Sequence, residues 1–416
     1  MAGPEVITMG CRLNIAESAV IEEKLAGHDN IIVVNSCAVT NEAVRQTRQA
    51  IRKAKKNAPD KKIIVTGCAA QIDPEQFAKM REVDQIFGNA EKLNLDRFLG
   101  EDIRRNSKII VDDIMQLTET APHFSTIFAE KSRGFVEIQN GCDHRCTFCI
   151  IPYGRGNSRS IPAGILVDRI KSLCQNNINE IILTGVDVTS YGQDLPGRPS
   201  LGNLVERILK LVPNLPRLRL SSIDGIEIDD HLFDLLTNEP RLMPHVHLSL
   251  QSGDDMILKR MKRRHNFAQA VDIVEKLQSK RPEITIGADI IAGFPTEDNE
   301  MFQNSVKMVR ECHIVHGHIF PYSPKKGTPA AKMPQVEGQL IKQRAKILRD
   351  EVAKQKEAWQ HGLIGSNQRI LVESSGHIGH AENFAMVKMA KKMLAGSLVN
   401  VHITHIENGQ LCGEQI

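Results

Sequence analysis

The chain has few aromatic residues and no long hydrophobic stretch. Its 416 residues include 13 Phe, three Tyr and one Trp. This shortage disfavours an antibody-like sandwich and a surface that holds nucleic acid mainly by stacking bases. No stretch approaches the ~20 apolar residues that a membrane-spanning helix needs. The opening MAGPEVITMG also lacks the apolar region of a secretory signal peptide. These absences predict a cytoplasmic protein with no membrane segment.

The chain as a whole also lacks a strong excess of either charge. It has 53 basic and 50 acidic residues, for a net charge of +3. The exception is residues 41–62, where eight basic residues face two acidic ones, a local net charge of +6. Four of the basic residues recur at helical spacing and form a basic stripe: Arg45, Arg48, Arg52 and Lys55. A solvated helix face and a phosphate-binding surface explain such a stripe equally well. The second basic run, KRMKRR at residues 259–264, is open to the same two interpretations.

Cysteine is the residue type that stands out. The chain has nine cysteines, and an odd number in a chain without a signal peptide disfavours a disulfide framework. Three lie together in CDHRCTFC at residues 142–149, and three more are spread through the first seventy residues. Cys174, Cys312 and Cys412 are isolated, and we expect them to be ordinary packing thiols.

The amino-terminal part alternates short β-branched runs with helical patterns. The runs at residues 6–8, 31–34 and 63–65 lead into the turns TMGC, VNSC and VTGC, and a helical pattern such as 43–56 follows. This alternation predicts a parallel sheet with Cys11, Cys37 and Cys68 at its carboxyl edge, where open α/β sheets bind ligands. A single cysteine at such a position is explained by the preference of tight turns for small residues. Three cysteines at the same position after successive strands favour a shared function. Three thiolates fit an iron–sulfur cluster with one open iron better than a zinc site, which takes four ligands.

Patterns in the rest of the chain predict two further parts, one of strands and helices and one of strands alone. Six strand-like runs, separated by amphipathic segments such as 165–174 and 268–277, indicate a partial (β/α)6 barrel; they lie at 135–138, 181–183, 218–220, 246–250, 284–291 and 317–320. A charged helical stretch at 336–360 leads to a tail with strand-like runs at 370–373, 385–389 and 398–406, which predicts a small β-barrel of the oligonucleotide-binding kind. We expect an α/β protein with domains at residues 1–125, 126–362 and 363–416.

The spacing C-x3-C-x2-C of Cys142, Cys146 and Cys149 is the most specific pattern in the chain. A zinc site would need a fourth ligand, and His144 inside the loop is poorly placed to supply it. The motif resembles that of the radical S-adenosylmethionine enzymes. In that superfamily three thiolates hold a 4Fe–4S cluster, whose remaining iron binds S-adenosylmethionine, and reduction yields a 5′-deoxyadenosyl radical.

The flanking residues narrow the resemblance to the methylthiotransferases. GCRLN at 10–14, NSCAVT at 35–40 and TGCA at 66–69 resemble the amino-terminal domain of that family. NGC at 140–142 and CIIP at 149–152 resemble its radical core, and the tail resembles its TRAM domain. The resemblance implies an auxiliary 4Fe–4S cluster on Cys11, Cys37 and Cys68, besides the one on Cys142, Cys146 and Cys149. Across all three segments the chain most resembles the threonylcarbamoyladenosine tRNA methylthiotransferases.

That resemblance implies insertion of a methylthio group at C2 of N6-threonylcarbamoyladenosine, next to the anticodon of tRNA. It also implies a reduced flavodoxin- or ferredoxin-type electron donor, while the sulfur source is not identified. The basic stripe would contact phosphates of the tRNA, with the target base exposed in the anticodon loop. Contacts with S-adenosylmethionine are expected from residues at strand ends: Gly185, Asp187, Ser222, Gln251, Asp289 and Gly293.

Three alternatives remain open on the sequence. Related methylthiotransferases with the same three domains act on an aspartate of a ribosomal protein, and others act on isopentenyl-adenosine in tRNA. The GCRLN start departs from the Gln-Met pattern of the isopentenyl-adenosine enzymes. A non-catalytic metal-binding RNA module is the alternative from a different class.

Overall fold

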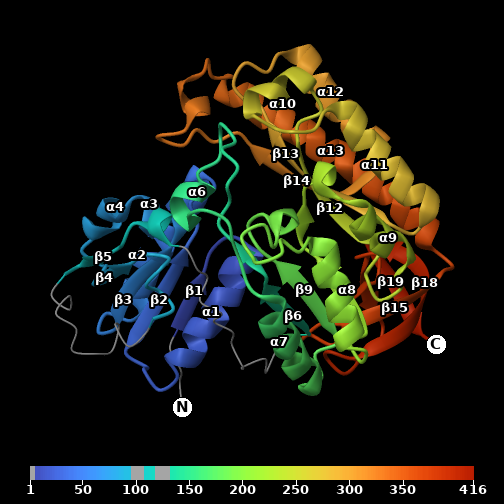
Figure 1. Cartoon of the computed structure of the whole chain (residues 1–416), viewed down its shortest axis with the longest axis horizontal. Coiled ribbons are helices and arrows are strands. Elements are labelled where there is room, and N and C mark those ends of the chain that lie inside the picture. The colour runs from blue at the N-terminus through green and yellow to red at the C-terminus, as the bar shows by residue number, and fades with distance from the viewer. Residues whose placement is uncertain (1–4, 95–106, 118–131) are drawn as a thin grey trace. The chain divides into compact units, whose positions relative to one another are not determined.

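The computed structural model describes residues 5–94, 107–117 and 132–416 (Figure 1). The chain divides into two compact units, of which the first comprises the described residues of Met1–Phe128, Glu137–Ile161 and Ser323–Thr328. The second comprises those of Ala129–Val136, Pro162–Tyr322 and Pro329–Ile416. The predicted boundary between residues 125 and 126 lies outside the described residues, so the three-domain division stays a prediction.

The first unit contains a five-stranded parallel sheet whose strands follow the order of the chain. The strands are β1 (Glu5–Thr8), β2 (Ile31–Ser36), β3 (Lys62–Gly67), β4 (Gln85–Phe87) and β5 (Ile109–Ile110). The connecting helices are α1 (Arg12–Lys24), α2 (Asn41–Asn57), α3 (Cys68–Ile72) and α4 (Pro74–Ala78). The prediction of parallel strands alternating with helices is confirmed, and β4 and β5 are two strands that the sequence patterns did not indicate.

Alternate residues of β2 bury themselves in two separate cores, as the two-residue repeat of a strand requires. Ile32 and Val34 pack with Ile51 of α2 and Phe77 of α4. Ile31 and Val33 pack in a second core that includes Ile21 and Leu25 from the region of α1. Because both faces are covered, every residue of β2 is buried.

The segment that carries the three clustered cysteines also belongs to the first unit. It leaves the strand pair β7 (Gln139–Asn140) and β8 (Arg159–Ser160), which is antiparallel, and returns through the short helix α6 (Ile151–Arg155). The 3-10 helix η2 (Ile114–Gln116) contacts α6.

The second unit is built on two sheets that meet at Ser221, between β10 and β11. One sheet has the order β10-β9-β6 and the other the order β11-β12-β13-β14. Strand β9 pairs in parallel with β10, and the four strands of the other sheet are all parallel. The strands are β6 (Arg133–Glu137), β9 (Glu180–Thr184), β10 (Arg217–Leu220), β11 (Ser222–Ile223), β12 (His245–Gln251), β13 (Thr285–Ala292) and β14 (Ile314–Pro321). Since β10 and β11 continue one run of chain, the strands form an open series of six in chain order, which confirms the predicted partial barrel.

Helices cover the outside of this series (Figure 1). They are α7 (Ala163–Gln175), α8 (Leu201–Leu211), α9 (Asp230–Asn238), α10 (Asp255–Met261), α11 (Phe267–Lys280), α12 (Asn299–Glu311) and α13 (Gly338–Leu363), with 3-10 turns η3 (Val188–Ser190), η4 (Gly225–Glu227) and η5 (Pro329–Lys332). Helix α13 packs against β14, where a Cβ on Gly317 would lie 2.6 Å from Cγ2 of Val352. The residues of β14 on either side of Gly317 therefore face the inner side of the sheet.

The tail forms the closed barrel that the sequence predicts, with strand order β15-β16-β17-β19-β18. Its strands are β15 (Asn367–Val372), β16 (Ile378–Ala381), β17 (Met386–Met389), β18 (Leu398–Glu407) and β19 (Gln410–Gln415). Strands β16 and β19 were not predicted, because they are short or carry polar residues. In the part of the chain that the structure describes, no helix combines the length and apolar character needed to cross a membrane.

Candidate metal centre

The three amino-terminal cysteines each lie at the point where a parallel strand ends. Cys11 follows β1 and precedes the first turn of α1, Cys37 follows β2, and Cys68 is the first residue of α3 directly after β3. Adjacent parallel strands end at one edge of a sheet, so these three turns are neighbours. The expectation that distant cysteines share one edge agrees with this topology.

Close approach of the turns is visible at Gly10 and Cys37. A Cβ on Gly10 would lie 2.7 Å from Cβ of Cys37 and 2.8 Å from its Sγ. Gly10 also has φ +94°, a backbone conformation that glycine adopts without strain. Glycine at this position therefore allows the turn that carries Cys11 to approach the thiol of Cys37.

The thiols also influence one another electrostatically. Burial is the main cause of the raised pKa of Cys37, about 11, and the neighbouring Cys68 and Cys11 contribute to the rise. Thiolate is the form that binds metal, so binding of a cationic centre would displace the proton of Cys37. A set of three converging thiols fits a metal centre that takes three sulfur ligands.

A buried guanidinium contacts this set of thiols. Nε of Arg155, in α6, lies 3.1 Å from Sγ of Cys68, although the two residues are 87 positions apart. Nη2 of Arg155 donates to Oδ1 of Asn14 at 2.5 Å and to Oε2 of Glu17 at 3.1 Å, and Nη1 donates to Oε1 of Glu17. Burial lowers the pKa of Arg155, but Cys68 and Glu17 outweigh burial and hold that pKa well above its ordinary value.

Several buried charged groups lie around the thiols. Glu17 pairs with Lys92 at 2.5 Å as well as with Arg155, and all three side chains are at most 3% exposed. Burial raises the pKa of Glu17, yet Arg155 and Lys92 outweigh it and lower the pKa to about 2. Burial and Glu17 raise the pKa of a second buried carboxyl, Glu137, to about 7, although Arg155 and Lys92 lower it. A further buried cation, Lys325, donates to Oδ1 of Asn41 at 3.0 Å. The guanidinium of Arg155 opposes burial and lowers the pKa of Cys11 and Cys37, which favours their thiolate forms.

The loop of Cys142, Cys146 and Cys149 has all three cysteines partly exposed. Its base is closed by the amide of Cys142, which donates to the carbonyl of Gly156 at 3.1 Å. Arg145 spans the loop, donating to the carbonyl of Cys142 and to Oδ1 of Asn157, each at 2.7 Å. The base of the loop is therefore held by its own polar groups, and the loop carries three thiols as soft ligands.

The second unit holds the residues predicted to contact S-adenosylmethionine. Gly185 and Asp187 follow β9, Ser222 begins β11, and Gln251 ends β12 with a left-handed φ of 67°. All four are partly buried, at or beyond the carboxyl ends of strands. Gly293 follows β13 with φ +72°, and a Cβ there would lie 2.6 Å from Cγ1 of Ile341. Packing against α13 thus gives Gly293 a structural role in addition to any contact with a ligand.

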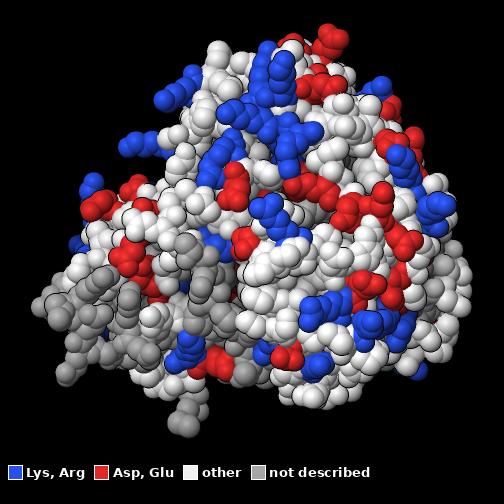
Figure 2. All heavy atoms as spheres, viewed as in Figure 1, with Lys and Arg blue, Asp and Glu red and all other residues white. Residues whose placement is uncertain are grey.

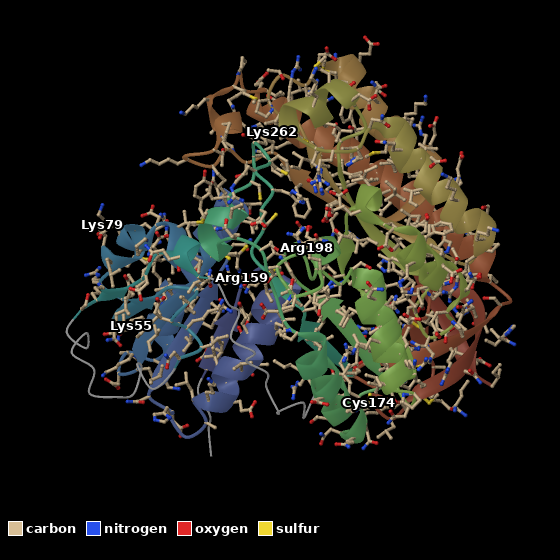
Figure 3. All side chains as sticks on the ribbon, viewed as in Figure 1. Lys55, Lys79, Arg159, Cys174, Arg198 and Lys262 are labelled. Carbon is tan, nitrogen blue, oxygen red and sulfur yellow. The ribbon has the colours of Figure 1, made fainter. Side chains whose placement is uncertain are left out.

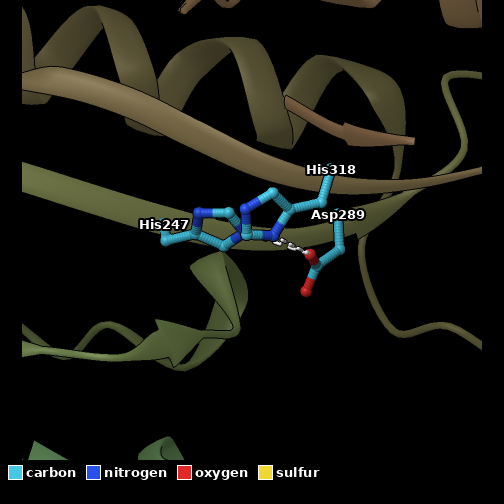
Figure 4. Close-up of side chains that lie close together, drawn as sticks. All are labelled: His247, Asp289 and His318. Atoms are coloured by element: carbon cyan, nitrogen blue, oxygen red, sulfur yellow. Dashed lines mark hydrogen bonds and ion pairs between the residues drawn. The ribbon is translucent and has the colours of Figure 1, made fainter. Parts of the chain in front are cut away.

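Asp289 lies within β13 rather than beyond its end, between two histidines of the neighbouring strands. Its Oδ1 is 3.1 Å from Nε2 of His247 on β12 and 3.1 Å from Nδ1 of His318 on β14 (Figure 4). Burial opposes ionisation, but the hydrogen bonds from His247 and His318 outweigh it and hold the pKa of Asp289 well below its usual range. The sequence patterns indicated Asp289 but neither histidine.

The two basic runs differ in how many of their side chains form ion pairs and how many are exposed to solvent. In α2 of the first unit, Arg48 and Arg52 are exposed, Arg45 pairs with Glu42 at 2.5 Å, and Lys55 donates to the carbonyl of Lys61. In the second unit, basic side chains gather around α10 and Lys262 (Figures 2 and 3). Two of these, Arg263 and Arg264, pair with Asp224, at 2.8 and 3.1 Å.

Sequence reasoning missed the residues that surround the cysteines: Arg155, Glu17, Lys92, Asn14 and Lys325. Only Arg155 carried a signal, because it lies in the short helix α6, which begins two residues after Cys149. Its partners Asn14 and Glu17 come from α1, and Lys92, which pairs with Glu17, lies after β4. Nothing local in those segments marks these residues.

Comparison with known proteins agrees with this arrangement. The Radical SAM superfamily matches residues 136–309, and the uncharacterized protein family UPF0004 matches residues 5–88. Among solved structures, the radical S-adenosylmethionine methyltransferase TsrM from Kitasatospora setae aligns with a TM-score of 0.53. That alignment covers 73% of this chain and 66% of TsrM at 16% identity, so the likeness is one of fold.

Relatives with assigned names include two with the same function and one with a related function. The threonylcarbamoyladenosine tRNA methylthiotransferase MtaB of Rickettsia prowazekii is 52% identical over 98% of this chain and 96% of its own length. The MtaB of Aquifex aeolicus is 34% identical over 95% of this chain and 98% of its own length. A tRNA-2-methylthio-N(6)-dimethylallyladenosine synthase of Rickettsia rickettsii is 29% identical over 98% of both chains. Radical S-adenosylmethionine enzymes use S-adenosylmethionine and a 4Fe–4S cluster. The chain belongs to the radical S-adenosylmethionine methylthiotransferases, in the MtaB family.

Proposed function

We propose that this chain transfers a methylthio group to C2 of N6-threonylcarbamoyladenosine, next to the anticodon of tRNA. The observation that carries the proposal is the 52% identity with an MtaB over 98% of the chain, against 29% with the dimethylallyladenosine synthase. Three strand-end cysteines and a three-cysteine loop within one compact unit support the same activity.

The six cysteines fit two metal centres of three sulfur ligands each. Cys142, Cys146 and Cys149 would hold the 4Fe–4S cluster that binds S-adenosylmethionine, and Cys11, Cys37 and Cys68 would hold an auxiliary 4Fe–4S cluster. When bound, the first supplies the electron that cleaves S-adenosylmethionine, and the second supplies the place for sulfur to be transferred. Each set supplies three thiols, so a cluster of four irons bound to them would keep one iron open to a small ligand.

The protein's own groups hold these ligands in place. Arg155 donates to Cys68 and to Glu17, so α6, which follows the radical motif, is fixed to the turn after β3. Asn14 donates to the carbonyls of Met9 at 2.7 Å and Ser36 at 3.1 Å, which ties the turns of Cys11 and Cys37 together. The guanidinium of Arg155 also lowers the pKa of Cys11 and Cys37 against the effect of burial, which favours their thiolate forms.

The remaining assignments follow from the family. Contacts of Gly185, Asp187, Ser222, Gln251 and Gly293 with S-adenosylmethionine, and of the basic stripe of α2 with tRNA phosphates, are part of the proposal. So are the domain limits 1–125, 126–362 and 363–416, and a reduced flavodoxin- or ferredoxin-type electron donor. Contacts with phosphates would set the position of the anticodon arm on the protein.

The decisive test is mass spectrometry of tRNA nucleosides from a strain that lacks this gene. We expect 2-methylthio-N6-threonylcarbamoyladenosine to disappear and its unmethylthiolated precursor to accumulate. The intact gene should restore the product, and a Cys68→Ala copy should not. Unchanged product in a deletion strain without a paralogue would reject the proposal. Loss of methylthio-aspartate from a ribosomal protein, or of the methylthio isopentenyl nucleoside, would identify the corresponding alternative substrate.

A further inference from the structure

His247, Asp289 and His318 form a polar cluster on the inner face of β12, β13 and β14. His318 lies next to Gly317, which faces α13, so its side chain points to the opposite face of β14. A Cβ on Gly287 would lie 2.4 Å from Nδ1 of His247, so the ring of His247 lies across β13 on that same face. The three side chains therefore belong to the inside of the strand series and not to its helix-covered exterior.

Rings close the cluster on the side of the strands' amino ends. His245 and His316 lie two residues before His247 and His318, on the same face of their strands. The ring of Phe384, from the turn between β16 and β17, stacks on His245 with centroids 4.8 Å apart and meets His316 edge-on at 5.6 Å. A ligand for the cluster must therefore approach from the carboxyl ends of the strands, the side on which barrel enzymes hold their substrates.

On this face, the exposed residues lie in the carboxyl-terminal half of β14. The side chain of His318 is 60% exposed, whereas that of His247 is 6% exposed. Two residues further along the same face, Phe320 is 36% exposed, and its ring meets that of His318 edge-on at 6.4 Å. An exposed aromatic ring and an exposed imidazole thus stand roughly 7 Å apart along one strand.

Asp289 prepares His318 to donate to an anion. The imidazole uses Nδ1 for its bond to Oδ1 of Asp289, so its other nitrogen, Nε2, is the one that can meet a ligand. In its doubly protonated form the ring carries a donor on Nε2 as well. A carboxylate that approaches Nε2 would receive a charge-assisted hydrogen bond.

We propose that this cluster recognises the carboxylate of the threonylcarbamoyl group, while Phe320 contacts the purine that carries it. This inference rests on the proposed function and specifies the part of the substrate that this face selects. A threonylcarbamoyl substituent has a carboxylate and a hydroxyl, and it extends from the purine over a length comparable to the spacing of Phe320 and His318. Under this proposal, Asp289 belongs to the binding site of the substrate and not to that of S-adenosylmethionine.

The same cluster would discriminate against a dimethylallyl group. An apolar substituent placed here would remove water from His318 and Asp289 without replacing their hydrogen bonds. A site built to pair with a polar group rejects an analogue that lacks it more strongly than an apolar pocket rejects an added polar group. His247, held between Gly287 and Asp289, acts as a positioning residue that keeps Asp289 in place.

The test measures binding of anticodon stem–loops to the reconstituted holoenzyme by fluorescence anisotropy. Four RNAs of one sequence carry threonylcarbamoyladenosine, its carboxyl methyl ester, dimethylallyladenosine or adenosine at the target position. For the unaltered enzyme we expect the free acid to bind about 10–100-fold more tightly than the ester, the range of one hydrogen bond to a charged group. His318→Gln should reduce that ratio to near one through weaker binding of the acid, with binding of the ester unchanged. Asp289→Asn should give an intermediate ratio.

Controls separate this inference from the proposed function. His313→Asn replaces an exposed histidine just before β14 and should leave the ratio unchanged; asparagine suits its φ of 46°. Iron content and visible absorption of each reconstituted variant should match those of the unaltered enzyme, which reports that the protein is folded and its clusters are loaded. A His318→Gln ratio equal to that of the unaltered enzyme overturns the carboxylate assignment. So does a divalent metal bound at one equivalent that depends on His318, because two histidines and a carboxylate also suit such an ion. Failure of the unaltered enzyme to methylthiolate any of the RNAs would instead reject the proposed function.

Discussion

Arg155 donates a hydrogen bond from Nε to Sγ of Cys68 at 3.1 Å. The arginine lies six residues after Cys149, and the cysteine directly follows the third strand of the amino-terminal sheet. One buried guanidinium therefore links the segment of the radical motif to the thiol proposed for the auxiliary cluster. Hydrogen bonds and charges close to cluster sulfurs set reduction potentials, so this contact has a measurable consequence.

Replacement of Arg155 by Gln should lower the midpoint potential of the auxiliary cluster. A cation beside the sulfur stabilises the reduced, more negative cluster, so its loss favours the oxidised form by on the order of 50 mV. The measurement is a redox titration followed by electron paramagnetic resonance in a background of Cys142→Ala, Cys146→Ala and Cys149→Ala. Lys92 still pairs with Glu17 at 2.5 Å, so the buried carboxylate keeps a partner in this variant.

Arg81→Gln in the same background is the matched control, because Arg81 is an exposed arginine of the same unit. It should keep both the iron content and the potential of the parent. If Arg155→Gln also keeps them, the Arg155–Cys68 contact has no role in tuning the cluster.

Single cysteine replacements should separate the two clusters. Cys146→Ala should lose about half of the iron and all cleavage of S-adenosylmethionine to 5′-deoxyadenosine, because one of three ligands is gone. Cys68→Ala should lose a similar amount of iron, keep that cleavage and form no methylthiolated product. Iron analysis, 5′-deoxyadenosine yield and product mass measure the three quantities on one preparation.

Cys174→Ala provides the control for these variants. Cys174 lies near the end of α7 in the second unit (Figure 3), and its replacement should affect none of the three quantities. Cleavage of S-adenosylmethionine by Cys146→Ala would remove that residue from the radical cluster. Normal product from Cys68→Ala would refute the auxiliary cluster.

The sequence was sufficient to predict the shared sheet edge of Cys11, Cys37 and Cys68, because strand periodicity and turn residues are local signals and parallel strands end together. It could not predict that Arg155 meets Cys68, since the contact depends on how segments 87 residues apart pack. Asp289 illustrates the same limit. The sequence placed Asp289 in a strand. Its partners lie on two neighbouring strands, and the register of these strands decides which residues lie beside it.

Loss of positive charge from the basic stripe of α2 should weaken binding of tRNA and flatten its salt dependence. Arg48→Gln with Arg52→Gln removes two exposed cations, and each phosphate that is no longer neutralised should reduce the slope of log K against log salt by about 0.7–0.9. Binding isotherms between about 50 and 200 mM salt measure this change. Lys79→Gln with Arg81→Gln removes the same charge from another part of the first unit and should leave the slope unchanged. Equal slopes for both double variants would return the stripe to the role of a solvated helix face.

Phe384 should stabilise the second unit despite an unfavourable backbone. Its φ is 68°, yet its ring stacks on His245 and lies 4.9 Å from the guanidinium carbon of Arg219. Phe384→Ala removes these interactions and keeps the left-handed backbone, for an expected cost of about 3 kcal/mol. Phe384→Gly removes the same interactions but relieves the backbone, so it should be less destabilised than Phe384→Ala by about 1 kcal/mol. Urea unfolding of the three proteins measures the difference, and a glycine variant less stable than the alanine variant would contradict this account of the strain.

Glu180 should make the second unit sensitive to acid. Burial raises its pKa, but Arg219 and Arg133 outweigh burial and lower the pKa to about 2, below the ordinary value of 4.5. Because the folded-state pKa is depressed, its contribution is complete above pH 4.5 and is lost as the pH falls toward 2. That contribution amounts to about 3 kcal/mol.

The acid sensitivity is tested by comparing the unaltered chain with Glu180→Gln. Glutamine keeps the shape but leaves Arg217 and Arg219 without their shared buried carboxylate, so the variant should be less stable near pH 6 by about 3 kcal/mol or more. Between about pH 5 and pH 3 the two unfolding free energies should converge, since protonation of Glu180 removes from the unaltered chain what the variant already lacks. Both proteins are measured without metal, so that acid loss of clusters does not contribute. A gap that stays constant over that range would show that Glu180 is not the group that titrates.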